Sequence, residues 1–210
     1  MINEILILDL IGTFAFASYG SYFAIKKDFD LFGIFVCAFL TAVGGGTIRE
    51  LILNHVPFYF FDEKYIATII IGIIFTILFF KKFQKINSFM LVLDAIGLVV
   101  FALIGANHAV NAGLGLFAVV FFAVITSVGG GLIRDMVMNE VPEIMHRDLY
   151  ASVAIVLGAA FWYGRNYINS MLFINILLAF CFALRMSAIT FKINLWKPAK
   201  KFEIENSAEF

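Results

Sequence analysis

The sequence predicts an all-α integral membrane protein with seven transmembrane helices, arranged as an inverted 3+3 repeat plus one C-terminal helix. Three observations lead to this fold class. The 210 residues are 62% hydrophobic and 14% charged, whereas a soluble domain is about 45–50% apolar and about 25% charged. Long apolar runs alternate with short charged clusters. One pattern of charged, glycine and proline residues also occurs twice along the chain.

Seven apolar runs are candidate transmembrane helices, because about 20 apolar residues cross the roughly 30 Å hydrocarbon core of a bilayer. The third and sixth runs are short. A polar tail without a core-forming pattern follows the seventh. The predicted spans are Ile5–Ile25, Leu31–His55, Tyr65–Phe80, Phe89–Val110, Leu114–Met138, Leu149–Tyr163 and Met171–Phe191.

The distribution of lysine and arginine between the two sets of loops predicts the orientation. One set holds only Lys64 and Arg165, whereas the other set and the tail hold ten such residues. By the positive-inside rule, the N-terminus is outside and the C-terminus is cytoplasmic, in a multi-pass protein of the cell inner (plasma) membrane. The ten residues are Lys26, Lys27, Lys81, Lys82, Lys85, Arg147, Lys192, Lys197, Lys200 and Lys201.

An internal repeat relates residues that are 85 positions apart. It divides the chain into a first three-helix repeat (1–85), a second, inverted three-helix repeat (86–165), a seventh helix (166–191) and a cytoplasmic polar tail (192–210). Because each copy has an odd number of spans, the second copy enters the membrane from the opposite side. The clearest matches are Asp9/Asp94, Phe16/Phe101, Gly20/Gly105, Asn54/Asn139, Pro57/Pro142, Tyr65/Tyr150 and the runs 41–50 and 126–135.

A glycine triplet lies near the middle of the second span and another near the middle of the fifth. Each glycine costs about 1 kcal/mol relative to alanine inside a helix. One interpretation is close helix packing through small residues. We favour a kinked or unwound segment whose carbonyl oxygens face a polar cavity and suit a partly dehydrated cation. The triplets are Gly44, Gly45, Gly46 and Gly129, Gly130, Gly131.

Charged residues follow both triplets at membrane depth, where ionised groups are costly and are functional candidates. Together with Asp9 and Asp94, they make two arginines and four carboxylates within the spans. This acid excess favours cations in any pore that they line; the alternative role is to lock the bundle through ion pairs. The predicted ion path comprises both glycine triplets with Thr47, Arg49, Glu50, Arg134 and Asp135.

The depths of these charges predict ion pairs within each repeat, Asp9 with Arg49 and Asp94 with Arg134. At 1.5 Å per residue, Asp9 lies roughly 6 Å below the start of its span, and Arg49 lies roughly 9 Å short of the outer end of its own. The two side chains of each pair therefore share a depth, and the second pair lies in the opposite half of the membrane.

The sequence gives no sign of an enzyme, a cofactor or a metal centre. It holds no Walker loop, no Ser-His-Asp arrangement and no H-E-x-x-H motif. A net formal charge of zero offers no basic surface for nucleic acid. The histidines show no metal-ligand spacing; they are His55, His108 and His146. The acids of one loop are interpreted as solvated; they are Glu140, Glu143 and Asp148.

Both repeats carry the motif G-G-G-x-I-R-[DE] followed by N-x-V-P, with an aspartate opening each unit. This pattern resembles the bacterial branch of the trimeric intracellular cation (TRIC) channel family, which overlaps with the UPF0126 or glycine-transporter domain. The resemblance covers about Ile5 to Phe191. It implies a homotrimer in membrane lipid, with a separate pore in each subunit that is lined by the kinked glycine segments. It further implies that the permeant ions are monovalent cations, mainly potassium, besides sodium.

Two functions remain open from the sequence. The first is a cation channel, in which a protein acid holds each of Arg49 and Arg134. The second is a carrier of a small zwitterion such as glycine, working by alternating access, in which one of these arginines clamps the substrate carboxylate. The acid excess and the resemblance favour the channel.

Overall fold

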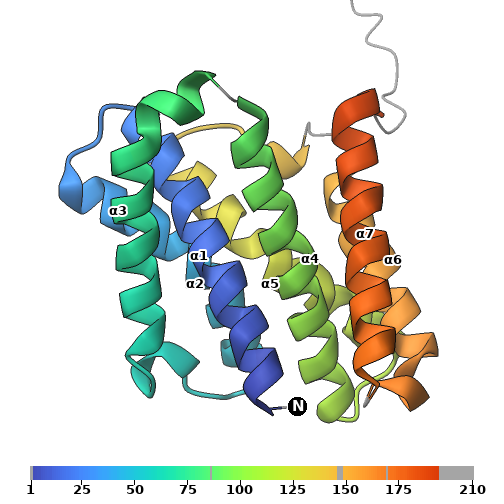
Figure 1. Cartoon of the computed structure of the whole chain (residues 1–210). Helices are drawn as coiled ribbons and strands as arrows, with labels where there is room; N and C mark the ends of the chain where they lie inside the picture. Colours follow the sequence, from blue (N-terminus) through green and yellow to red (C-terminus); the bar gives the residue numbers. More distant parts are fainter. Residues whose placement is uncertain (1, 86, 146–148, 169, 194–210) are drawn as a thin grey trace, which may run out of the picture.

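The computed structural model describes residues 2–85, 87–145, 149–168 and 170–193. Within these ranges the regular elements are α-helices and three short 3₁₀ turns, as Figure 1 shows. The expectations for His146, Arg147, Asp148 and the tail beyond Ile193 lie outside the described residues. The helices are α1 (Ile2–Lys26), α2 (Leu31–Ile52), α3 (Lys64–Lys85), α4 (Asn87–Asn111), α5 (Leu116–Val137), α6 (Tyr150–Tyr163) and α7 (Met171–Phe191).

The helix bounds follow the predicted spans closely. Among the described helices, six are long and apolar enough to cross a membrane, and α6 is shorter, with 14 residues. The largest difference is in α3, which continues to Lys85 and has 22 residues, so the prediction of a short third span is wrong. Its last turns contain Lys81 and Lys82, whose long side chains let a helix continue beyond the apolar run while their amines reach water.

The recurring N-x-V-P motifs end α2 and α5. Asn54 and Asn139 have φ angles of 57° and 54°, a left-handed conformation that asparagine tolerates better than most residues. The amide of His55 then donates to the carbonyl of Glu50 at 2.8 Å, and the equivalent bond after α5 measures 2.9 Å. This arrangement caps the helix end, and the proline that follows cannot resume the helix. The motif therefore recurs because it stops both helices at equivalent points.

The centre of the bundle consists of α1, α2, α4 and α5. As Figure 1 shows, α3 lies beside α1, whereas α6 and α7 lie on the side of α4. Equivalent helices of the two repeats contact each other, α1 with α4 and α2 with α5. Phe16 of α1 packs against its repeat equivalent, Phe101 of α4, with ring centroids 5.1 Å apart. Contacts between equivalent residues are what an approximate two-fold relation between the repeats produces.

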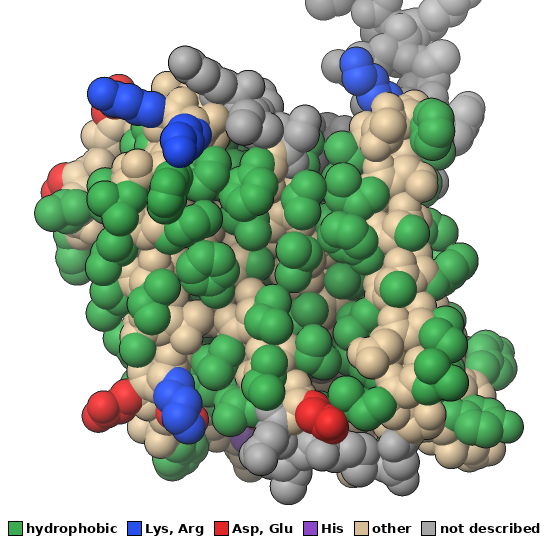
Figure 2. Space-filling view, viewed as in Figure 1, with side chains coloured by type: hydrophobic (Ala, Val, Ile, Leu, Met, Phe, Trp, Pro, Cys, Tyr) green, Lys and Arg blue, Asp and Glu red, His purple; other side chains and the backbone are tan. Residues whose placement is uncertain are grey.

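The surface is apolar between two charged ends. In Figure 2, hydrophobic side chains cover the middle of the molecule, and the charged side chains gather toward its top and bottom. The exposed side chains include Leu78, at 72%, and Phe180, at 55%. An apolar surface of this extent suits the hydrocarbon of a bilayer. The chain is therefore a multi-pass membrane protein.

Candidate functional site

The glycine triplets are the places where α2 and α5 touch. A Cβ atom added to Gly45 would lie 2.1 Å from the carbonyl oxygen of Thr126, and one added to Gly130 would lie 2.2 Å from that of Thr41. Only glycine permits this approach of two backbones. Both helices continue through their triplets, so the predicted unwinding is wrong, because close packing of the two helices compensates for the cost of glycine. The kink stays a prediction.

The same contacts set the direction of the crossing. In each helix, the threonine before the triplet lies beside the triplet of the other helix, so α2 and α5 cross in opposite directions. Arg49 and Arg134, which follow the triplets, therefore lie on opposite sides of the crossing. Thr47 and Gly131 are two further members of the predicted ion path. Thr47 donates to the carbonyl of Val43 at 2.8 Å, whereas a Cβ atom on Gly131 would meet only Arg134, at 3.9 Å.

Two threonine hydroxyls lie where the four central helices meet. A Cβ atom on Gly20 of α1 would lie 2.4 Å from Thr41 Oγ1, and one on Gly105 of α4 would lie 2.7 Å from Thr126 Oγ1. Thr41 Oγ1 donates to the carbonyl of Cys37 at 2.6 Å. Thr126 Oγ1 is buried and has no hydrogen-bond partner in the part of the chain that the structure describes. The crossing is thus close-packed and contains polar groups at its centre.

The first charged cluster lies at the C-terminal end of α2 and contains Asp9, Arg49, Glu50, His55, Tyr65 and His108. Arg49 donates from Nε and Nη2 to one oxygen of Glu50, at 2.9 and 2.6 Å. The Asp9 carboxylate accepts a hydrogen bond of 2.7 Å from the Tyr65 hydroxyl. All of these groups except the imidazoles are buried.

The predicted pair of Asp9 with Arg49 is therefore wrong. Arg49 takes the carboxylate of its neighbour in sequence, Glu50, and Asp9 takes a tyrosine hydroxyl. Depth had placed the two charges at one level of the membrane, but it does not specify the side of the helix to which each points.

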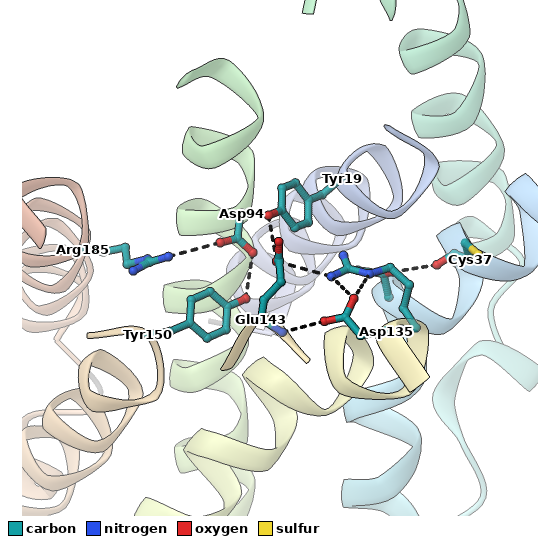
Figure 3. Close-up of polar contacts among 9 residues, drawn as sticks. Tyr19, Cys37, Asp94, Asp135, Glu143, Tyr150 and Arg185 are labelled. Atoms are coloured by element: carbon teal, nitrogen blue, oxygen red, sulfur yellow. Dashed lines mark hydrogen bonds and ion pairs between the residues drawn. The ribbon is translucent and has the colours of Figure 1, made fainter. Parts of the chain in front are cut away.

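The second charged cluster lies at the C-terminal end of α5 and is drawn in Figure 3. Arg134 donates from Nε and Nη2 to one oxygen of Asp135, at 2.8 and 2.6 Å, and Nη2 also lies 3.4 Å from Glu143. The other Asp135 oxygen accepts the backbone amide of Glu143 at 2.9 Å. Tyr19 of α1 donates to Glu143 at 2.9 Å. Glu143, which the sequence suggested to be merely solvated, is thus part of the cluster.

Beside this cluster, Asp94 contacts a tyrosine and a third arginine. Its carboxylate accepts a 2.8 Å bond from the Tyr150 hydroxyl and lies 3.6 Å from the guanidinium of Arg185 in α7, as Figure 3 shows. The predicted pair with Arg134 is wrong for the same reason as in the first repeat. Arg185 was missing from the predicted set, although its position inside the last apolar run is a signal that a sequence reader could use.

A cleft opens at the end of the molecule that carries the second cluster. It has a volume of about 280 Å³ and is lined by residues at the C-terminal ends of α1 and α5 and in the connections that follow them, including Phe23, Asp135 and Glu143. Lys27 and Glu140, both exposed, form an ion pair between these two connections. The cleft thus gives solvent access to the acids of the second cluster.

The described part of the chain is all-helical and multi-pass, and buried arginine–carboxylate clusters lie on both sides of a glycine-packed helix pair. These features are typical of transporters and channels. The sequence profile of the family described as "Glycine transporter" matches residues 6–81 and again residues 91–166. The chain therefore belongs to this family, also called UPF0126, of which TRIC channels are the structural neighbours. The two matches lie 85 residues apart, which confirms the internal repeat.

Relatives and solved structures agree with this assignment. A UPF0126 membrane protein of Deinococcus radiodurans is 42% identical over 158 residues, which is 74% of each chain. A structure described as the basis for conductance through TRIC cation channels has 35% identity and a TM-score of 0.84, and covers 94% of this chain and 97% of its own. A TRIC trimeric intracellular cation channel orthologue from Rhodobacter sphaeroides has 31% identity and a TM-score of 0.83, and covers 90% of this chain and 99% of its own.

Proposed function

We propose that this protein is a monovalent cation channel that conducts mainly potassium, with one ion path per subunit between α2 and α5. The observation that carries the proposal is its likeness in fold and sequence to TRIC cation channels over 94% of the chain. The Rhodobacter sphaeroides neighbour is described as trimeric, and we extend the proposal to a homotrimer in membrane lipid.

The buried charges support a cation path. The described buried residues include four carboxylates, Asp9, Glu50, Asp94 and Asp135, and three arginines, Arg49, Arg134 and Arg185. If all are ionised, the excess charge is negative and attracts cations. Each arginine also pairs with a protein acid, as the channel hypothesis requires, whereas a carrier would need an arginine that is available to a substrate carboxylate.

The proposal includes an orientation and a location. Seven helices span the inner membrane, the two repeats are inserted in opposite directions, and the N-terminus lies outside. The first cluster then faces the outer side and the second cluster, with its cleft, faces the cytoplasm. A kink at each triplet would direct backbone carbonyls of α2 and α5 toward the path, where a cation can exchange water for carbonyl oxygen.

Purified protein in a planar bilayer tests the proposal. In symmetrical KCl we expect discrete unitary currents, and in a tenfold KCl gradient a reversal potential that approaches about 59 mV with the sign of a cation conductance. Replacing K⁺ by a large organic cation should abolish the current. Silence in the bilayer, together with saturable uptake of labelled glycine into proteoliposomes, would contradict the channel and support the zwitterion carrier.

A further inference from the structure

Two histidines that are far apart in sequence converge on one buried carboxylate. His55 follows α2, and its Nδ1 lies 3.2 Å from Glu50 Oε2. His108 lies in the last turn of α4, and its Nδ1 lies 3.8 Å from Glu50 Oε1. The imidazoles are 62% and 36% exposed, whereas the Glu50 side chain is 6% exposed. Solvent therefore reaches the nitrogens, while the protein holds the carboxylate in place.

This combination of groups matches a transition-metal ligand set. Zinc binds imidazole nitrogen and carboxylate oxygen at about 2.0–2.2 Å in tetrahedral geometry. Two ligand atoms at such distances from one tetrahedral ion are about 3.4 Å apart. The 3.2 Å separation between His55 Nδ1 and Glu50 Oε2 is close to this value, and His108 Nδ1 lies 3.8 Å from the other oxygen of the same carboxylate. We propose that His55, His108 and Glu50 form a binding site for Zn²⁺ or a similar divalent transition metal.

The site is completed by small movements when the ion arrives. The described residues contain no preformed group of three such side chains at metal-binding geometry. Both imidazoles reach solvent, and either ring nitrogen can face the ion. Three protein ligands leave the fourth position to water, as in open zinc sites.

Arg49 limits the affinity of the site for the metal ion and determines which Glu50 oxygen can bind the ion. Its guanidinium occupies Glu50 Oε1 through two hydrogen bonds, so Oε2, which faces His55, is the oxygen that is available to the ion. The positive charge of Arg49 repels a divalent cation at this distance. We therefore expect binding that is weaker than at a structural zinc centre.

The equivalent positions of the second repeat do not carry the same three groups. In the second repeat, the position equivalent to His108 is Phe23, and the position equivalent to His55 is Glu140. Phe23 packs over Arg134, with the guanidinium carbon 4.8 Å from the ring centroid. At these two positions the second cluster has no nitrogen ligand, and we expect one metal ion per chain, bound at the end where α2 terminates.

Thermal unfolding and calorimetry of the tag-free protein in detergent test this site with ZnCl₂ as the probe. Zn²⁺ should raise the unfolding temperature of the wild type. In each of His55→Ala and His108→Ala the half-saturating concentration should rise by about tenfold or more, whereas His146→Ala, which changes the remaining histidine, should bind like the wild type.

Unchanged zinc binding in the double variant His55→Ala with His108→Ala would overturn the site. Equal stabilisation by Mg²⁺, a cation that prefers oxygen ligands, would overturn it too, because it would show that no nitrogen ligand takes part. Because both measurements report binding, they stand apart from the channel proposal, which fails or succeeds on bilayer currents.

Discussion

Arg49 and Arg134 occupy equivalent positions but have unequal partners. Arg49 bonds to Glu50 and lies over the ring of Phe58, with its guanidinium carbon 5.7 Å from the centroid. At the position equivalent to Phe58, the second repeat has Glu143, so Arg134 has two acids within reach. The two clusters therefore differ in how well they withstand the loss of one carboxylate.

This difference predicts that Glu50→Gln destabilises the protein more than Asp135→Asn does. Glu50→Gln leaves a buried guanidinium without a carboxylate partner, a change that typically costs 3–5 kcal/mol, whereas Asp135→Asn leaves Arg134 with Glu143 and should cost about half as much or less. The unfolding temperature in detergent, measured for both variants, checks the order.

The control for this prediction is the double variant Asp135→Asn with Glu143→Gln, which removes both acids from Arg134. It should lose about as much stability as Glu50→Gln. A double variant no less stable than Asp135→Asn alone would show that Glu143 does not support Arg134.

A second prediction at this scale concerns the tyrosine–aspartate bonds. Tyr65→Phe should destabilise the protein more than Tyr150→Phe, because Asp94 keeps the Arg185 guanidinium, whereas the Tyr65 hydroxyl is the hydrogen-bond donor that the structure gives Asp9. A buried acceptor without its donor costs about 1–3 kcal/mol. Unfolding temperatures of the two variants measure the difference, and equal losses would contradict it.

The sequence was a reliable guide to which polar residues belong to the charged clusters. It was a poorer guide to the contacts that these residues make. The repeat singled out Tyr65 and Tyr150, but it did not show that their hydroxyls serve Asp9 and Asp94. Residues one apart on a helix do not usually face each other, and only the length of the arginine side chain lets Arg49 fold back onto Glu50. Pairing depends on rotamers and helix rotation, which depth alone leaves open.

At the scale of the helix, the glycine triplets give the clearest prediction. Gly45→Ala and Gly130→Ala each place a methyl group little more than 2 Å from a backbone carbonyl oxygen of the partner helix. Because a backbone cannot yield as a side chain does, α2 and α5 must separate. We expect a loss of several degrees or more in unfolding temperature, and altered unitary currents if the path lies between these helices.

Gly131→Ala is the matched control, since it changes the same triplet. A Cβ atom there has only Arg134 Nη2 nearby, at 3.9 Å, so the variant should be neutral or gain up to about 1 kcal/mol from the better helix propensity of alanine. Equal damage from Gly131→Ala and Gly130→Ala would show that the triplets act through backbone flexibility and not through close packing.

Most of the helices could be predicted because a bilayer imposes their length and their apolar composition. The observed bounds of α7, Met171–Phe191, agree with the predicted seventh span at both ends. The state of the triplets could not be predicted, because a glycine cluster is compatible with a break and with close contact. The choice depends on whether another backbone lies opposite, and this is a property of tertiary packing.

At the scale of the molecule, the duplication explains why the two charged clusters lie on opposite sides of one helix crossing. Equivalent residues meet at Phe16 and Phe101, and each triplet packs on the other repeat. The sequence of one repeat therefore specifies both ends of the molecule in outline. The differences between the ends, such as Arg185 at one and His108 at the other, come from α7 and from positions where the copies have diverged.

Labelling of single cysteines can test the opposite insertion of the two repeats directly. Lys26, the last residue of α1, and Asn111, the last residue of α4, are equivalent and exposed positions. If the repeats are inverted, Asn111→Cys reacts with a membrane-impermeant maleimide in intact cells, whereas Lys26→Cys reacts only after permeabilisation. The native cysteines do not interfere, because Cys37 and Cys181 are buried, at 1% and 0% exposure.

Glu63→Cys, in the connection before α3, should label like Asn111→Cys and serves as the positive control for the outer side. Labelling of Lys26→Cys and Asn111→Cys from the same side would contradict the inversion, whereas reversal of all three would keep it and overturn only the orientation that the lysines and arginines predict.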